Sequence, residues 1–308
     1  MTRRQSRLRK LFAEGGTALR AISRPPTFAY LCPICLRVLP EQALRDGELT
    51  EDHVPPRAVG SRLSVLVCRA CNTSAGHQVD CELVRRTRAI DSARSFARAQ
   101  RHSFDATLDA FECRVRVRVS RDGPGAAIAM KPDERRNDPS ELVRYRHAMD
   151  RLASEGGWDG TKLNFNIEPA FDSRRADIAA LRAGYLSAFA LWGYSFACWP
   201  SLGPVRRQIA EPSVGHITRF SFAGRAKAVV PCSHAILLAT TPFACLLVVM
   251  DSAVVLLPSR ADDSTLYERF ATTRDLQFSG DKWWAWPRRP EYRLDTRGSR
   301  RVSPGEFA

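Results

Sequence analysis

The alternation of apolar and polar residues predicts a strand pair in the middle of the chain. Residues 113–130 read CRVRVRVSRDGPGAAIAM, and their period of two predicts antiparallel strands that turn at Asp122-Gly123-Pro124-Gly125. The valines at odd positions then face a core, and the arginines at even positions face outward. This arginine row either forms a solvated face of the sheet or binds a nucleic-acid backbone, and the pattern does not choose between these two interpretations. Its members are Arg114, Arg116 and Arg118.

Helical periodicity and apolar runs predict the elements on either side of this pair. We expect helices at residues 81–108 and 142–152, and a short strand at residues 162–167. A third helix, capped by Asp172, contains IAALRAGYLSAFALWGY, which is apolar on nearly every face and so belongs at the centre of a core. Residues 217–258 contain the runs AILLAT, CLLVVM and AVVLLP, which predict strands. The chain is therefore expected to be α+β.

The uncharged run at residues 183–205 approaches the length of a membrane span. It contains glycine, serine and proline and follows an arginine-rich helical start, so we interpret it as a buried helix that ends near Trp199. The N-terminus carries basic residues followed by mixed ones, without the apolar stretch of a signal peptide. These features predict a soluble, cytoplasmic protein with no membrane partner.

The charge of the chain points to a polyanionic partner. The 308 residues include 47 Lys and Arg against 33 Asp and Glu, a net charge of +14. Such an excess favours nucleic acid first and an anionic membrane surface second. A basic surface without any partner is the remaining interpretation. Because charge alone does not choose among these, the choice depends on the chemistry of particular residues.

Four of the nine cysteines form two CxxC pairs, and an odd cysteine count without a secretory signal argues against a disulfide scaffold. Each pair is a turn that aims two thiolates at one point, and two such turns make a tetrahedral four-cysteine site whose usual metal is zinc. Four thiolates leave no open coordination position, so we expect this Zn²⁺ to be structural. The predicted ligands are Cys32, Cys35, Cys68 and Cys71.

A second motif lies between and beside these pairs. The segment LTEDHVPPRAVG, residues 49–60, places Asp52 directly before His53, and Asn72 directly follows the second CxxC pair. The ordered set CxxC, Asp-His-x-Pro, CxxC-Asn resembles the HNH endonucleases, also called ββα-metal nucleases. It is most similar to their zinc-stapled branch, which includes the phage junction-resolving endonuclease VII type. The resemblance covers residues 29–82, about a sixth of the chain.

The resemblance implies a β-hairpin and a helix that cradle one divalent metal ion, Mg²⁺ or Mn²⁺. It assigns His53 as the general base that activates the attacking water, and Asp52 and Asn72 as metal ligands. His77 is either a further metal or phosphate contact or a plain exposed histidine. These roles agree with elementary chemistry, because a neutral imidazole accepts a proton near neutral pH and hard oxygen ligands suit Mg²⁺.

Two details of the motif need a structural solution. Adjacent residues of a strand point to opposite faces, so Asp52 and His53 serve one site only if the chain bends or bulges there. Many HNH proteins also carry an asparagine before the second pair, where this chain reads RLSVLV at residues 62–67. We expect Ser64 to replace the hydrogen bonds of that asparagine.

The leading hypothesis is a metal-dependent HNH endonuclease that hydrolyses DNA, with a role in phage defence or mobile-element biology by analogy with the family alone. RNA stays open as a substrate because the chemistry needs only a phosphodiester. The alternative is a non-catalytic zinc module that binds nucleic acid or protein. The sequence contains no P-loop, nucleophile-elbow serine or dinucleotide fingerprint, so an ATP-driven subunit is not expected.

We expect three parts in the chain. Residues 1–28 form a basic N-terminal arm, and residues 29–108 form the HNH module with the arginine-rich helix that follows it. Residues 109–308 form a mixed α/β C-terminal domain of unknown fold that regulates, recognises the target or mediates oligomerisation. A homodimer and a regulatory partner are the open alternatives. The predicted phosphate contacts beside the site are Arg85, Arg86 and Arg88.

Overall fold

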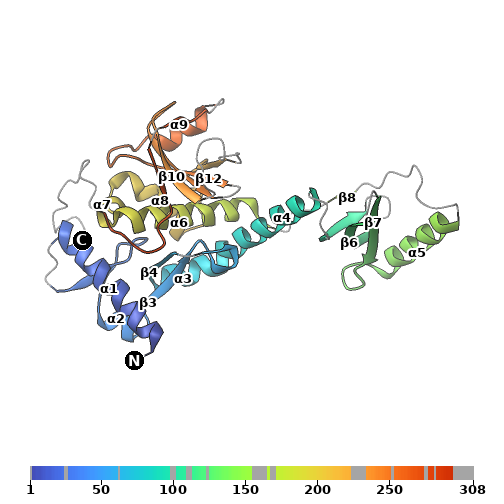
Figure 1. The fold of residues 1–308 in the computed structure, drawn as a ribbon, viewed down its shortest axis with the longest axis horizontal. Coiled ribbons are helices and arrows are strands. Elements are labelled where there is room, and N and C mark those ends of the chain that lie inside the picture. The colour runs from blue at the N-terminus through green and yellow to red at the C-terminus, as the bar shows by residue number, and fades with distance from the viewer. Residues whose placement is uncertain are drawn as a thin grey trace. The chain divides into compact units, whose positions relative to one another are not determined.

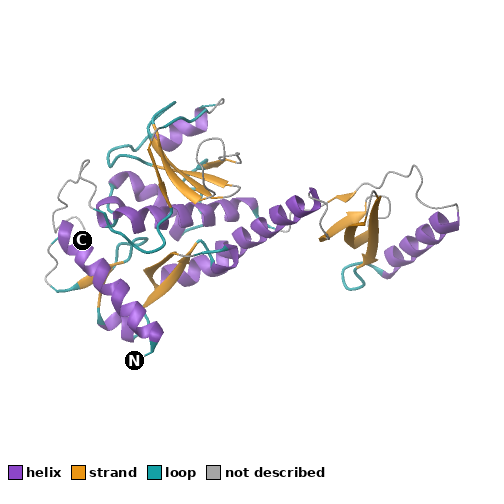
Figure 2. Ribbon diagram, viewed as in Figure 1, coloured by secondary structure: helices purple, strands orange, loops and turns teal. Residues whose placement is uncertain are grey.

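The structure is a computed structural model, and its described residues contain both helices and sheets, which confirms the α+β class (Figure 2). These residues are 2–23, 27–61, 63–97, 102–108, 113–122, 125–154, 165–166, 171–222, 234–250, 253–273, 277–280 and 282–293.

By its internal contacts the chain divides into two compact units. The first unit combines residues 1–84 with residues 171–308, and the second consists of residues 85–170. The second unit is thus an insertion between two segments of the first. The expected boundaries after residues 28 and 108 do not coincide with these limits, because the chain returns to its first unit after the insertion.

The first unit begins with the helix α1 (Arg3–Ile22). A capping box starts it: the Thr2 side chain accepts a hydrogen bond from the backbone of Gln5 at 3.2 Å, and the Gln5 side chain accepts one from the backbone of Thr2 at 2.9 Å. The helix buries an apolar face, and the ring of Phe12 lies 6.2 Å from a tyrosine ring of the strand β1 (Ala29–Leu31). The described part of the expected N-terminal arm is therefore a packed helix.

Two antiparallel hairpins follow α1, and the second of them runs into a helix. β1 pairs with β2 (Val38–Pro40), and the first CxxC pair lies in the turn between them. β3 (Leu49–Val54) pairs with β4 (Leu63–Cys68) along its whole length, without a break in register. The second CxxC pair joins β4 to α3 (Arg69–Ala75). The remaining elements of this segment are α2 (Gln42–Arg45), η1 (Arg57–Val59), the π-helical turn η2 (Gly76–Asp80) and α4 (Cys81–Ala97), which continues into the second unit.

The returning segment of the first unit contributes an antiparallel sheet in the order β13-β10-β11-β12-β9. Its three middle strands correspond to the three predicted apolar runs, so that prediction is confirmed. The strands are β9 (Ser221–Phe222), β10 (His234–Ala239), β11 (Cys245–Met250), β12 (Ala253–Leu257) and β13 (Lys282–Ala285). The helices are α6 (Ser173–Trp192), α7 (Tyr194–Ala197), η4 (Pro200–Leu202), α8 (Gly203–Ala210) and α9 (Leu266–Thr272).

The helix α6 is the centre of the first unit. Asp172 caps it as predicted, because its side chain accepts a hydrogen bond from the backbone of Arg175 at 2.9 Å. The helix contacts β12 of the sheet and also β3, β4 and η2 of the hairpin region (Figure 1). Gly184 is required where α6 meets the sheet, since a Cβ there would lie 2.7 Å from a side-chain carbon of Val255. Contacts on several sides explain why the sequence of α6 is apolar nearly all round.

In the described part of the chain, no helix is long and apolar enough to cross a membrane. The uncharged run at residues 183–205 is divided among α6, α7, η4 and the start of α8. The long helix ends at Trp192 rather than near Trp199, because Gly193 adopts a φ of 66° and turns the chain.

The second unit contains a four-stranded antiparallel sheet in the order β7-β6-β5-β8. Its strands are β5 (His102–Leu108), β6 (Cys113–Asp122), β7 (Gly125–Pro132) and β8 (Phe165–Asn166). The helix α5 (Pro139–Ser154) lies where a helix was predicted for residues 142–152. Residues 102–108 pair with β6, so the prediction of a helix through residue 108 was wrong for this stretch.

The strand β6 has the predicted alternation of faces. Val115 and Val117 are buried in a small core with Tyr145 of α5. The arginines between them are exposed on the opposite face, namely Arg114, Arg116 and Arg118. The period of two therefore identified both the strand and its buried side correctly.

Candidate active site and metal centre

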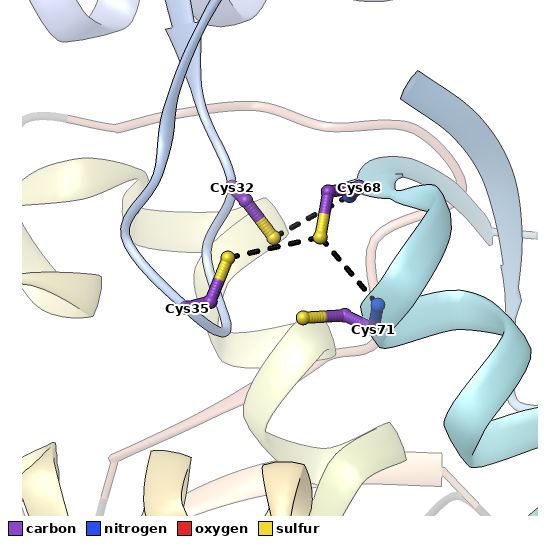
Figure 3. A group of neighbouring side chains, drawn as sticks. All are labelled: Cys32, Cys35, Cys68 and Cys71. Atoms are coloured by element: carbon purple, nitrogen blue, oxygen red, sulfur yellow. Dashed lines mark hydrogen bonds between the residues drawn. The ribbon is translucent and has the colours of Figure 1, made fainter. Parts of the chain in front are cut away.

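The four predicted cysteines come together in the first unit (Figure 3). Two lie in the turn after β1, one ends β4, and one lies in the first turn of α3. Their Sγ atoms all lie within 4.8 Å of one another, and those of Cys35 and Cys68 are 3.7 Å apart. Tetrahedral zinc with bonds of about 2.3 Å requires sulfur atoms about 3.8 Å apart. The predicted cluster is confirmed, and its geometry fits a structural metal such as zinc.

The backbone shapes both halves of this cluster. The N–H of Leu36 donates to the carbonyl of Cys32 at 2.9 Å, and Leu36 adopts a φ of 59° that closes the turn. The N–H of Cys68 donates to the Cys32 Sγ at 3.4 Å, and the N–H of Cys71 donates to the Cys68 Sγ at 3.5 Å. Such hydrogen bonds favour the thiolate, which is the form that binds metal.

A basic cavity lies beside the hairpin of β3 and β4. Glu51 and His53 are two residues apart in β3, so their side chains share one face of the strand and line this cavity of about 490 Å³. Four arginines complete the lining, three from the first turns of α1 and one from η1. They are Arg3, Arg4, Arg7 and Arg57.

Hydrogen bonds hold the ring of His53 in place. Its Nδ1 lies 2.9 Å from the Oγ of Ser64, the residue directly opposite on β4. Arg7 donates to the same Oγ at 2.8 Å and forms an ion pair with Glu51 at 2.8 Å. Ser64 therefore contacts the histidine ring, and its replacement of the missing asparagine stays a prediction. Arg7 of α1 therefore holds Ser64, and Ser64 holds His53.

The surroundings of His53 keep its imidazole neutral. Burial lowers the pKa of His53, and the positive charge of Arg57 lowers it further. Glu51 raises this pKa by less than Arg57 lowers it, and Arg7 adds a smaller lowering. Since the ordinary pKa of histidine is about 6.5, the ring is neutral at pH 7. When Nδ1–H donates to Ser64, Nε2 keeps a lone pair that can accept a proton.

Asp52 lies on the opposite face of β3 from His53. The register pairs Asp52 with Val65 and His53 with Ser64, so the strand has no bulge that would bring the two side chains together. The Asp52 carboxylate is 5% exposed and accepts a hydrogen bond from the Nη2 of Arg182 in α6. Burial raises the pKa of Asp52 to about 6, even though the charge of Arg182 lowers it.

The other predicted site residues belong to α3, η2 and α4. The Asn72 side chain donates to the Thr50 Oγ1 at 3.0 Å and to the carbonyl of Glu51 at 3.3 Å, which ties α3 to β3. Thr50 and Asp52 share a face, so Asn72 lies on the side of Asp52. The side chain of His77 lies outside the described residues. The predicted phosphate contacts lie on α4 in the second unit, with Arg85 and Arg88 exposed and Arg86 partly buried.

The donor set predicted for Mg²⁺ or Mn²⁺ does not fit that ion in this arrangement. Among the described residues, the four cysteines form the one group of three or more histidines, cysteines and acids arranged to hold a metal. The Asp52 carboxylate is bound by Arg182, and the Asn72 amide is bound to β3. The pairing with Arg182 therefore occupies the Asp52 carboxylate, which the prediction assigned to a hard cation.

Sequence reasoning missed two contributors to these sites. The arginines of α1 reach the cavity through packing that leaves no local signal. Arg182 did leave a signal, since it is a charged residue within an apolar helix, and a buried arginine needs acidic partners. Its presence predicts a buried ion pair, although not which acids form it.

Comparison with known proteins gives no relative for this chain: no protein-family model, curated protein or solved structure matches it. The interpretation of the site therefore depends on its own geometry and on the resemblance of its motif.

Proposed function

We propose that the protein hydrolyses phosphodiester bonds of nucleic acid, with His53 as the general base. The observation that carries this proposal is the imidazole of His53, held by Ser64, in a cavity that four arginines line. A phosphodiester is an anion, so the arginines attract it and the histidine meets it in the form that accepts a proton. The resemblance of residues 29–82 to HNH nucleases supports the same chemistry.

The reaction can be written with the residues of this chain. Nε2 of His53 takes a proton from a water molecule as the water oxygen bonds to phosphorus. The bond from phosphorus to the leaving oxygen breaks, and that oxygen takes a proton from solvent. The arginine side chains offset the negative charge that builds on the phosphoryl oxygens in the transition state. These steps use His53 and the arginines, because Asp52, the acid predicted to hold Mg²⁺ or Mn²⁺, is paired with Arg182.

DNA is the proposed substrate, and RNA is the alternative that the same chemistry allows. A role in phage defence or mobile-element biology, in the cytoplasm, belongs to this proposal by family analogy alone. So does a homodimer or regulatory partner that would control cutting.

The test is conversion of supercoiled plasmid by zinc-loaded full chain, with His53→Ala and His147→Ala beside the wild type. His147 is an exposed histidine of α5 and serves as the matched control. Separate reactions contain Mg²⁺, Mn²⁺ or a chelator too weak to remove the zinc. We expect the wild type and His147→Ala to nick or linearise the plasmid and His53→Ala to lose at least 100-fold in rate. Equal cutting by all three proteins would overturn the role of His53.

A second candidate function is a zinc module that binds nucleic acid without cutting it. The ion pair between Asp52 and Arg182 favours this candidate, because it occupies the acid that the motif assigns to a catalytic metal. The two candidates differ in one result. Folded, zinc-loaded protein that binds labelled DNA and leaves it intact in every reaction supports the binding module.

A further inference from the structure

A buried group of charges joins the hairpin to the central helix of the first unit. Arg182 of α6 is 2% exposed and reaches two acids from different elements, Asp52 of β3 and Asp80 of η2. Its Nη2 donates to Asp52, and its Nη1 lies 3.1 and 3.4 Å from the two carboxylate oxygens of Asp80. One guanidinium thus serves two carboxylates, and the proposed hydrolysis uses none of the three groups.

The chemistry of this group resembles that of a cation site. Two carboxylates converge on one positive centre, as they do around a divalent ion in a metalloenzyme. Here the positive centre is covalently part of the chain. Arginine suits such a place because its planar fork binds carboxylates with paired hydrogen bonds and keeps its charge at every physiological pH.

We propose that Arg182 is the permanent cation of the acidic pocket formed by Asp52 and Asp80, so that this pocket does not take up Mg²⁺ or Mn²⁺. The sequence motif assigns one of these two acids, Asp52, as a ligand of a divalent ion, together with Asn72. The inference concerns binding of the ion, and it holds or fails independently of whether the protein cuts nucleic acid.

Two physical arguments oppose exchange of Arg182 for a metal ion. Mg²⁺ gives up its waters reluctantly and keeps several of them in protein sites, whereas the Asp52 carboxylate is almost fully enclosed. A displaced guanidinium would also be left without partners among the buried neighbours of α6, such as Ile178 and Tyr185. Leaving a charge buried and unpaired is strongly unfavourable. The guanidinium is therefore expected to stay with its acids.

This assignment makes Asp52 a structural link between two elements rather than a metal ligand. Asp52 fastens β3 to α6 through Arg182, and the same strand carries His53 on its other face. The positive charge that faces a bound phosphate then comes from the arginines of the cavity. Asp52 is a positioning residue in this scheme, and it acts through the placement of its strand.

The deciding experiment is a Mn²⁺ titration of the full, zinc-loaded chain, followed by the electron paramagnetic resonance signal of free Mn²⁺. Wild type is compared with Asp52→Asn and with Asp262→Asn, a control at an exposed acid that pairs with Arg260. We expect one and the same binding curve for all three proteins up to millimolar Mn²⁺. A stoichiometric Mn²⁺ site that the wild type and Asp262→Asn share, and that Asp52→Asn lacks, would overturn the proposal.

A second variant tests the exclusion directly. Arg182→Gln frees the carboxylates of Asp52 and Asp80. If this variant keeps its zinc and the circular dichroism spectrum of the wild type, it should gain a Mn²⁺ site. The double variant Asp52→Asn with Arg182→Gln should lose that site again. A folded Arg182→Gln protein that gains no Mn²⁺ contradicts the view that Arg182 keeps the ion out. If Arg182→Gln does not fold, the comparison of wild type with Asp52→Asn still decides.

Discussion

The residue on which the proposed chemistry depends, His53, is supported through a chain of side chains from two elements. Ser64 holds its ring from the facing strand, and Arg7 holds Ser64 from α1. The hydroxyl has room for both contacts because an oxygen can accept one hydrogen bond while taking part in another. Removal of the Ser64 hydroxyl should therefore affect the orientation of the His53 ring more than the binding of substrate.

Ser64→Ala is expected to lower kcat by about 10-fold or more and to leave KM nearly unchanged. The loss in kcat is a part of the roughly 10²–10⁴-fold rate contribution of a general base. The matched control is Ser61→Ala, whose hydroxyl bonds to the carbonyls of Val54 and Leu63 instead of the histidine. Single-turnover cleavage measures the effect. A parallel loss in both variants would show that Ser64 has no special link to His53.

The pH profile of cleavage reports the charge of His53. Its pKa is lowered in the folded protein, so the rate should rise with pH along a limb whose midpoint lies below about 6.5. Arg57→Met removes the first of the charges that depress this pKa, and the limb should move to higher pH. Arg45→Met, at an exposed arginine of α2, should leave it in place. An unmoved limb in Arg57→Met would contradict this electrostatic account.

Arg182→Met tests the buried ion group through stability. Arg182 lowers the pKa of Asp52, which burial nevertheless raises to about 6, so without the guanidinium this pKa rises further. The folded state then keeps a proton that the unfolded chain, with a pKa of about 3.9, releases. The variant should consequently lose stability as the pH rises from 4 toward neutrality.

We expect Arg182→Met to cost about 3–5 kcal/mol at pH 7.5, and less at pH 5. Urea unfolding at the two pH values measures both losses. Arg207→Met, at an exposed arginine of α8, should change stability by less than about 0.5 kcal/mol at either pH. A loss that is the same at both pH values would argue against a titrating carboxyl.

Distance along the chain explains which residues of the site could be predicted. The cysteines lie within one motif, and Ser64 lies opposite His53 in a hairpin, so local sequence was sufficient for these residues. It did not separate Asp52 from His53, whose side chains lie on opposite faces of β3. Arg7 and Arg182 bind partners 57 and 130 residues away. Only the packed fold brings such residues together.

Among the elements, α1 shows how a charged sequence can conceal a packed helix. Its basic residues suggested an arm, yet one face buries Leu11, Phe12 and Leu19 while the first turns bring arginines to the cavity. The apolar positions are spaced at helical intervals, and that pattern was available in the sequence. The many basic residues of this segment drew the interpretation away from that apolar pattern.

Phe12→Ala should cost about 3–5 kcal/mol, because the ring is 2% exposed and its loss leaves a cavity. Lys10→Ala, on the exposed side of the same helix, should stay within about 0.5 kcal/mol of wild type. Denaturant unfolding measures both. A neutral effect of Phe12→Ala would mean that α1 is a loosely attached arm after all.

The strands of the chain were predicted where their pattern was simple. The alternation of β6 and the apolar runs of β10, β11 and β12 identified these strands. The strand β5 was missed because it follows an arginine-rich helix without a proline or glycine between them. Its pairing with β6 decides its conformation, and that contact is not visible in the local sequence.

At the scale of the molecule, the four-cysteine cluster joins the two hairpins of the first unit. Metal that binds the folded state alone stabilises it, so removal of zinc should lower Tm. A loss of about 5 kcal/mol would lower Tm by about 8 °C in a chain of 308 residues. Zinc release to a colorimetric chelator and thermal unfolding check this together.

Cys71→Ser should reproduce the effect of zinc removal, and Cys198→Ser should retain both the metal and the wild-type Tm. The prediction is for one zinc ion per chain. A Cys71→Ser protein that melts like the wild type would leave the cluster without a structural role.

The division of the chain into units could not be read from the sequence. Composition separates segments that follow one another, whereas the first unit is assembled from two segments with the second unit inserted between them. Tyr194 of the later segment shows the dependence directly, since its hydroxyl donates to the carbonyl of Leu31 at 2.8 Å and accepts from its N–H at 3.2 Å.

This arrangement has a consequence for the order of events during synthesis. A ribosome releases the cysteine hairpins and His53 long before it has made α6 and α7, whose side chains complete their core. The nascent N-terminal segment therefore gains its core contacts with α6 and α7 only after the whole inserted unit has been translated. We therefore expect the nucleolytic activity proposed for this protein to appear only in chains that extend through α6 and α7.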